Sequence, residues 1–221
     1  MISLQTVGPF AAELGEPDDN LVTKAADALA EAAGIGKGAS IVLDKQLPVA
    51  SGIGGGSADA AAALRLLTSL WQIDPKYAEE VAPRLGSDVP ACLLSLPTRG
   101  VGAGDILTSI DFWGLSDTPV LLVNPRVSMP TAEVYARWAG EDRGALGDWR
   151  EGRNDLQAPA ISLAPQIEAV LAWLGTRPGA SFVRMSGSGA TCFALFDDEQ
   201  ARDHAAMAVP REWWRLATFL R

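Results

Sequence analysis

The sequence predicts an α+β fold in which strands form an antiparallel sheet with helices packed on one face. Short runs rich in Val, Ile and Leu alternate with longer stretches whose apolar residues recur at helical spacing. Glycine and proline separate most of these segments, which is typical of turns between elements. The chain has 221 residues, of which 48% are apolar and 20% charged, so it can bury a sizeable core.

In the first half of the chain, each expected helix has a start or stop signal. The residues Asp18-Asp19-Asn20 can cap the first helix, and Ser57 can cap the second. Gly86 can end the third helix. The expected elements are strands over 2–7 and 40–44, helices over 21–33, 57–71 and 76–85, and a hairpin over Thr98–Asp111.

A second unit is expected to begin near Thr118, where Pro119 precedes a buried-strand pattern. We therefore divide the chain into an N-terminal domain of residues 1–117 and a C-terminal domain of residues 118–221. The expected elements here are strands over 119–123, 181–185, 191–196 and 213–220, and helices over 131–139, 165–174 and 198–208.

The composition argues against several classes of partner. Asp and Glu outnumber Lys and Arg by 27 to 18, a net charge of −9, which disfavours nonspecific binding to nucleic acid or to an anionic membrane. No apolar run approaches the about 20 residues of a membrane-spanning helix, and the start does not have the pattern of a signal peptide. Cys92 and Cys192 lack metal-ligand spacing, so we expect reduced thiols in a cytoplasmic protein.

The most informative stretch is a glycine-rich loop that runs from Pro48 to Ala58, ahead of the second helix. Glycine lets a ligand approach the backbone closely, and a helix start offers unpaired N–H groups and the positive end of a dipole. These features predict a site for the phosphates of a nucleotide, with Ser57 as a ligand to phosphate or Mg²⁺. The loop is not a Walker A motif, because no Gly-Lys-Ser/Thr closes it. The alternative is a strand-to-helix connector whose glycines relieve crowding.

Three further places can carry chemistry, each with a plainer alternative. Asp88 can accept a proton from a substrate hydroxyl that attacks phosphorus, or it is a turn aspartate bonded to its own backbone. The loop Ser186–Gly189 can bring N–H groups to a phosphate, or it is a hairpin turn. Lys45 can screen phosphate charge, or it is a solvated strand end.

Taken together, these stretches resemble the GHMP kinase superfamily of small-molecule kinases. The second motif of that superfamily, Pro-x3-Gly-Leu-Gly-Ser-Ser-x-Ala, stands here as Pro48–Ala58. Its third motif, a small-residue loop between strands, stands as Met185–Phe193. The resemblance implies a two-domain fold, with an N-terminal α/β domain and a C-terminal ferredoxin-like α/β sandwich.

Within the superfamily the chain resembles the family of 4-diphosphocytidyl-2-C-methyl-D-erythritol kinases, through Asp19–Leu21, Asp44–Pro48, Gly86–Pro90 and Asn154–Leu156. The resemblance implies that the γ-phosphoryl group of ATP is transferred, with Mg²⁺, to the 2-hydroxyl of that small-molecule substrate. This reaction is a step of the non-mevalonate route to isoprenoid precursors.

The resemblance also implies roles for individual residues. Asp88 would be the general base, and Asn20 would lie near the adenine. Lys45 would lie near the phosphates, and Gly187–Gly189 would close the site from the second domain. The implied nucleotide-binding residues are Asn20, Lys45, Pro48, Gly52, Ile53, Gly54, Gly55, Gly56, Ser57 and Ala58, and the implied substrate-binding residues are Asp88, Gly187, Ser188 and Gly189.

One departure from the family concerns the start of the sequence. Members carry a Lys-Leu-Asn-Leu-like motif, whose lysine works beside the aspartate, and an Asp-Gly-Tyr-His-like stretch that holds the cytosine. This sequence begins after both, so we expect residues 1–221 by themselves to be weakly active at best and a longer form to be a kinase. The alternatives are another GHMP kinase (homoserine or mevalonate type), a non-catalytic nucleotide-binding or scaffold protein, and a purely structural module.

Overall fold

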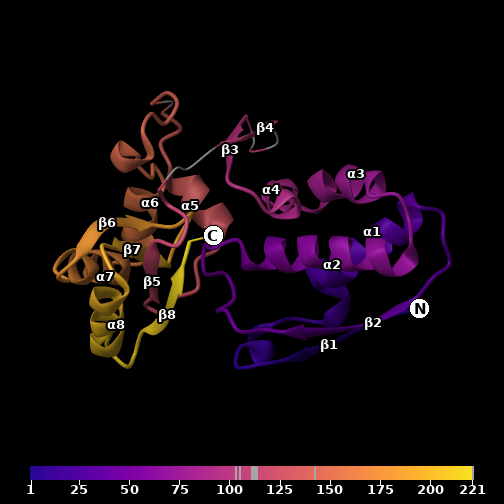
Figure 1. Cartoon of the computed structure of the whole chain (residues 1–221), viewed down its shortest axis with the longest axis horizontal. Helices are drawn as coiled ribbons and strands as arrows, with labels where there is room; N and C mark the ends of the chain where they lie inside the picture. Colours follow the sequence, from indigo (N-terminus) through magenta and orange to yellow (C-terminus); the bar gives the residue numbers. More distant parts are fainter. Residues whose placement is uncertain (103, 105, 111–113, 142, 221) are drawn as a thin grey trace. The chain divides into compact units, whose positions relative to one another are not determined.

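The computed structural model describes residues 1–102, 104, 106–110, 114–141 and 143–220 (Figure 1). Residue contacts define two compact units. Unit 1 comprises Met1–Val49 and Gly54–Asp111, and unit 2 comprises Ala50–Ile53 and Phe112–Arg221. Four residues of the glycine-rich loop, Ala50–Ile53, therefore belong to unit 2, whereas the residues before and after them belong to unit 1. The sequence did not predict this assignment. The functional division into domains 1–117 and 118–221 stays a prediction.

Unit 1 contains a pair of strands, β1 (Ile2–Val7) and β2 (Ala39–Asp44), joined by helix α1 (Leu21–Ala32). The strands are parallel, with Ile2 opposite Ala39 and Val7 opposite Asp44. An antiparallel arrangement was expected here and is wrong for this pair, because a strand–helix–strand crossover returns the chain in the same direction. Asn20 caps α1, since its Oδ1 accepts a hydrogen bond of 2.9 Å from the amide of Val22.

Helix α2 (Gly55–Trp71) forms the centre of unit 1, with β1 and β2 on one side of it and helix α3 (Lys76–Leu85) on the other (Figure 1). Its buried face carries Ala60, Leu64 and Trp71, which belong to a core shared with α1 and α3. The expected cap at Ser57 is wrong. The helix begins two residues earlier, because Gly54 adopts a left-handed conformation (φ 68°) as its N-cap.

Three short elements, a helix and two strands, follow α3 in unit 1. Helix α4 (Val89–Leu94) was not predicted, because six residues are too few for a clear helical pattern. Strands β3 (Thr98–Val101) and β4 (Ile106–Ser109) pair antiparallel and confirm the expected hairpin, although Asp111 lies outside the described residues.

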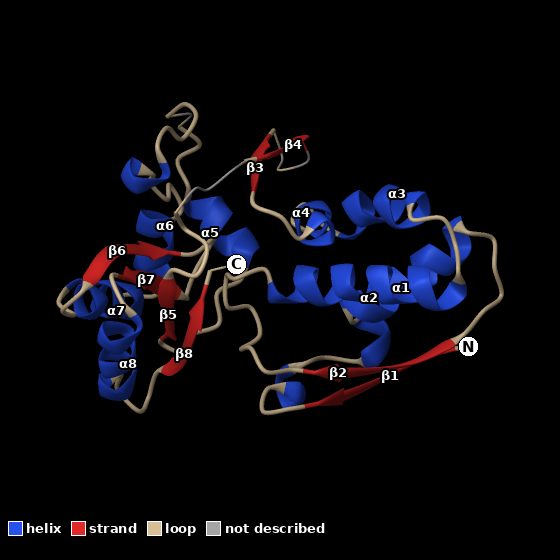
Figure 2. Cartoon of the chain, in the orientation of Figure 1, coloured by secondary structure: helices blue, strands red, loops and turns tan. Residues whose placement is uncertain are grey.

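Unit 2 is a four-stranded antiparallel sheet in the order β6-β7-β5-β8 (Figure 2). With α7 and α8 as the two helices that pack on the sheet, the order is strand–helix–strand–strand–helix–strand, the ferredoxin-like arrangement, and α5 and α6 are inserted between β5 and α7. Its strands are β5 (Pro119–Asn124), β6 (Ala180–Met185), β7 (Cys192–Phe196) and β8 (Trp214–Phe219); its helices are α5 (Thr131–Arg137), α6 (Gln157–Leu163), α7 (Gln166–Gly175) and α8 (Glu199–Ala208). Helix α6 was not predicted.

The core of unit 2 lies between the sheet and helices α7 and α8. Alternate strand residues such as Leu121 and Ala194, which pair across β5 and β7, point into this layer. Ile167 and Leu174 of α7 cover them and are fully buried. This layered packing confirms the expected antiparallel sheet with helices on one face.

Candidate functional site

The start of α2 presents three backbone N–H groups in unit 1 that have no acceptor among the described residues. The first hydrogen bond within the helix runs from the amide of Ala58 to the carbonyl oxygen of Gly54, at 2.9 Å. The amides of Gly55, Gly56 and Ser57 therefore have no partner within the helix, as at any helix start. These donors and the positive end of the helix dipole make a suitable site for an anion.

The glycines at this helix start differ in what surrounds them. Gly56 is exposed and has no positive φ, and a Cβ atom added to it would meet no atom within 4 Å from other described parts of the chain, its own helix backbone and chain neighbours aside. Alanine would normally be the more stable choice at a helical position, by about 1 kcal/mol. Protein packing among the described residues therefore does not explain glycine at 56, and the open space there is compatible with the predicted approach of a ligand. Gly54 likewise has open space, but its left-handed φ already favours glycine.

Lys45 follows β2 and reaches the same helix start with its side chain. Its ammonium Nζ lies 2.6 Å from Oδ2 of Asp59, which belongs to α2. A Cβ atom on Gly55 would lie 3.6 Å from this Nζ. The side chain of Lys45 is only 7% exposed, so its alternative as a solvated strand end is wrong. Asp59 was not singled out in the sequence, and no local pattern links residues 45 and 59.

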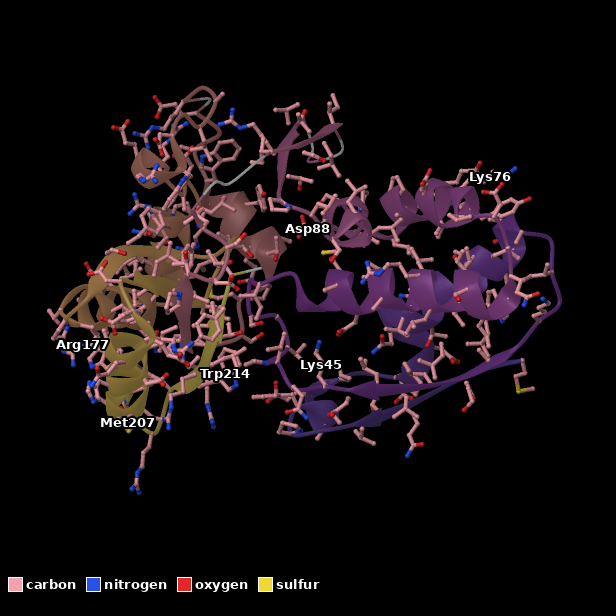
Figure 3. The ribbon with its side chains drawn as sticks, in the orientation of Figure 1. Lys45, Lys76, Asp88, Arg177, Met207 and Trp214 are labelled. Atoms are coloured by element: carbon pink, nitrogen blue, oxygen red, sulfur yellow. The ribbon has the colours of Figure 1, made fainter. Side chains whose placement is uncertain are left out.

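Asp88 directly precedes α4, and its side chain makes no capping hydrogen bond. The alternative of a turn aspartate bonded to its own backbone is therefore not supported, and the carboxylate is exposed. Figure 3 shows Lys45 on one side of the N-terminal end of α2 and Asp88 on the other.

The charge of Asp88 also acts on the thiol of Cys92 in α4. Burial raises the pKa of the Cys92 thiol, the Asp88 carboxylate raises it further, and Arg65 lowers it.

The other predicted nucleotide-binding residues of unit 1 are more dispersed. The side-chain oxygen of Asn20 accepts the capping bond from the amide of Val22. Pro48 is buried in the loop, and Ala58 is exposed on the second turn of α2. A contact of any of these three residues with nucleotide stays a prediction.

The segment Ala50–Ile53 of the glycine-rich loop belongs to unit 2 and packs there against the loop between β6 and β7. Gly52 has a φ of 75°, and the carbonyl oxygen of Gly189 occupies the position of its missing Cβ. A Cβ on Gly187 would in turn lie 2.9 Å from the carbonyl oxygen of Gly52. The amide of Thr191 also donates to the carbonyl of Ser51, at 3.1 Å. These glycines therefore allow two backbones to touch.

The loop Ser186–Gly189 is a hairpin turn between two paired strands, as its plainer alternative proposed. The amide of Gly189 donates to the carbonyl of Ser186, and the Ser188 hydroxyl lies 2.9 Å from that of Thr131. Ser188 and Gly189 are buried, while Gly187 is exposed. A contact of these three residues with substrate stays a prediction.

Two asparagine side chains distant in sequence support this loop, and the sequence alone predicts no such role for them. The Nδ2 of Asn154 donates to the carbonyl oxygens of Met185 and Gly187, at 2.9 and 2.8 Å. The buried Asn124 donates from Nδ2 to the hydroxyl of Thr191, at 2.9 Å. An asparagine supplies two amide hydrogens at once, which suits it to fixing adjacent carbonyls of a tight turn.

Two negative findings apply to the described part of the chain. It contains no group of three or more His, Cys, Asp or Glu side chains placed to hold a metal ion. None of its helices has both the length and the apolar character that crossing a membrane would need.

Both units match family models of one kinase family. The model of the GHMP kinases N terminal domain matches residues 20–95, and that of the GHMP kinases C terminal matches residues 136–215. The chain belongs to the GHMP kinase family. Its two-unit α+β fold is the fold of that family.

Two relatives of known name and one solved structure are similar to most of the chain. A protein of Rhizorhabdus wittichii called 4-diphosphocytidyl-2-C-methyl-D-erythritol kinase is 52% identical, over 99% of this chain and 79% of the relative. A protein of the same name from Novosphingobium aromaticivorans is 47% identical, over 99% of this chain and 76% of the relative. The crystal structure of a 4-(cytidine 5'-diphospho)-2C-methyl-D-erythritol kinase superposes with a TM-score of 0.80 at 30% identity, over 97% of this chain and 80% of that one.

Proposed function

We propose that this protein is an ATP-dependent kinase that phosphorylates the 2-hydroxyl of 4-diphosphocytidyl-2-C-methyl-D-erythritol. The observation that carries the ATP part is the start of α2, where Gly56 leaves open space beside unpaired amides. The similarity to kinases that carry this substrate in their name supports the acceptor part. The oligomeric state does not enter the proposal.

The residues of unit 1 suit the phosphoryl-transfer chemistry. The amides of Gly55–Ser57 would bind the phosphates of ATP, and the Lys45 ammonium would offset part of their charge. Asp88 would accept the proton of the 2-hydroxyl while the hydroxyl oxygen attacks the γ-phosphorus and ADP leaves. Such a base contributes about 10²- to 10⁴-fold to the rate.

Mg²⁺ fits this arrangement as an ion bound mainly by phosphate oxygens. Mg²⁺ commonly keeps several waters and takes only one or two protein ligands in kinase sites, so a dedicated cluster of carboxylates is not required. Ser57, in the first turn of α2, has the hydroxyl that would serve as such a ligand. The ion would neutralise charge that develops on the transferring group.

The two free cysteines also suit a reducing compartment, so we propose a cytoplasmic location.

A panel of acceptors tests the proposal. The protein is incubated with Mg²⁺ and ATP and with 4-diphosphocytidyl-2-C-methyl-D-erythritol, homoserine or mevalonate, and phosphorylated product is detected by ³¹P NMR. We expect product with the first acceptor alone. Product with homoserine or mevalonate instead would favour another GHMP kinase activity. Binding of Mg²⁺-ATP without product from any acceptor, also by a longer form that carries the Lys-Leu-Asn-Leu-like segment, would favour a non-catalytic nucleotide-binding protein.

A further inference from the structure

Two hydrogen bonds fix the backbone of Lys45 at the end of β2. Its amide donates to the carbonyl oxygen of Val7 at 2.8 Å, and its carbonyl oxygen accepts from the amide of Phe10 at 3.2 Å. These bonds join the end of β2 to β1 and to the loop that follows β1. The Cα of Lys45 is therefore fixed, and only the flexible side chain decides where the charge lies.

The ammonium end of that side chain lies where a positive charge is unfavourable by itself. It is buried beside Gly55 at the start of α2, close to the positive end of the helix dipole. A buried ammonium also loses its hydration and needs a partner of opposite charge. That partner is Asp59, whose Oδ2 lies 2.6 Å from Nζ of Lys45. The two residues are 14 positions apart in the sequence.

We propose that Asp59 is a positioning residue, which holds the Lys45 ammonium beside the amides of Gly55–Ser57 so that both act on the same phosphate. This inference rests on the proposed ATP site and adds a residue to it. Asp59 acts through Lys45 and does not contact the nucleotide. Its side chain is 27% exposed, so water reaches the outer side of the carboxylate while the ammonium stays shielded.

The test measures binding of Mg²⁺ with a non-hydrolysable ATP analogue by isothermal titration calorimetry, so it does not depend on turnover. The variants are Asp59→Asn, Lys45→Met and the double variant. We expect each single variant to weaken binding by about 10- to 100-fold, which is the typical effect of losing a charge-assisted contact. The double variant should bind as Lys45→Met does, because Asp59 has nothing left to position.

A matched control is Asp74→Asn, which breaks the exposed pair of Lys76 and Asp74 (3.6 Å) and should leave binding unchanged. Thermal unfolding of every variant separates loss of folding from loss of affinity. Asp59→Asn leaves a buried ammonium unpaired, whereas the double variant removes both charges and is expected to fold in any case.

Two results would overturn the inference while leaving the ATP site intact. One is wild-type affinity in folded Asp59→Asn. The other is weaker binding by the double variant than by Lys45→Met, which would mean that Asp59 itself binds the phosphate or the metal ion. Absence of binding by the unchanged protein would instead refute the ATP site itself, and with it this inference.

Discussion

The backbone of Gly52 touches the carbonyl oxygen of Gly189, so closely that no Cβ fits between them. The glycines of the Pro48–Ala58 loop therefore differ in what surrounds them. Gly52 is required by the packing of unit 2, whereas a Cβ on Gly56 would meet no packing neighbour among the described residues, which suits the proposed phosphate site. Gly52 and Gly56 should respond differently to substitution.

Replacing Gly52 by Ala should destabilise unit 2 by roughly 2–4 kcal/mol, because the new methyl group overlaps a carbonyl and the φ of 75° adds backbone strain. The measurement is the free energy of unfolding in urea. Gly34→Ala is the control, since Gly34 has a φ of 62° but open space around it, so only the strain of about 1–2 kcal/mol should appear. Equal losses in the two variants would contradict the packing role of Gly52.

Replacing Gly56 by Ala should leave the protein as stable as before, or more stable by up to about 1 kcal/mol, because alanine favours helix. Its affinity for Mg²⁺-ATP should nevertheless fall, because the methyl group would fill the space beside the amides. Calorimetry measures the affinity and thermal unfolding the stability. Gly175→Ala, in helix α7 with no atom within 4 Å, should raise stability in the same way without affecting nucleotide. Unchanged affinity in Gly56→Ala would remove the main support for the phosphate site.

Replacing Asp88 by Asn should lower kcat by about 10²- to 10⁴-fold with little change in Mg²⁺-ATP affinity, because the amide cannot accept the hydroxyl proton. Steady-state kinetics and calorimetry together test this expectation, and Asp27→Asn, on the exposed side of α1, is the control. A readout without turnover is the Cys92 thiol, whose pKa should fall when the Asp88 charge is removed. Alkylation rates against pH would report that change. A kcat within threefold of the unchanged protein would exclude Asp88 as the base.

Stability should decrease at alkaline pH because of Cys192. Burial raises its pKa from 9.0 to about 12, so above pH 9 the unfolded chain releases the thiol proton while the folded chain keeps it. The contribution to the free energy of unfolding is complete below pH 9 and is lost as the pH rises toward 12. Urea midpoints at pH 8, 9 and 10 should fall less steeply for Cys192→Ala than for the unchanged protein. Parallel slopes would argue against the shift.

Local patterns in the sequence were sufficient to predict most helices and strands. Hydrophobic periodicity located α2 and the strands of unit 2, and the stretch Asp18-Asp19-Asn20 marked the start of α1, where Asn20 is the cap. The pattern failed where an element was too short, as in α4, or where a backbone conformation decided the boundary. Gly54 adopts the left-handed conformation and starts α2 two residues before the expected cap at Ser57.

Contacts between residues that are distant in the chain could not be predicted from the sequence, for a different physical reason. The glycine loop was identifiable because its donors, dipole end and small residues are adjacent in the chain. The pairing of Lys45 with Asp59, and the bonds from Asn154 to the loop near Gly187, depend on how separate elements pack. The parallel direction of β1 and β2 likewise follows from the crossover through α1.

The route of the chain through Ala50–Ile53 limits how the protein can be dissected. Because this segment is flanked by unit 1 on both sides but packs in unit 2, no single cut yields two complete pieces. A fragment that starts at residue 112 would expose the backbone surfaces of Gly187 and Gly189 that Gly52 normally covers, and the amide of Thr191 would lose its acceptor. The other fragment would carry Ser51 and its neighbours without the part of unit 2 against which they pack. We therefore expect each fragment to be incomplete when it is expressed alone.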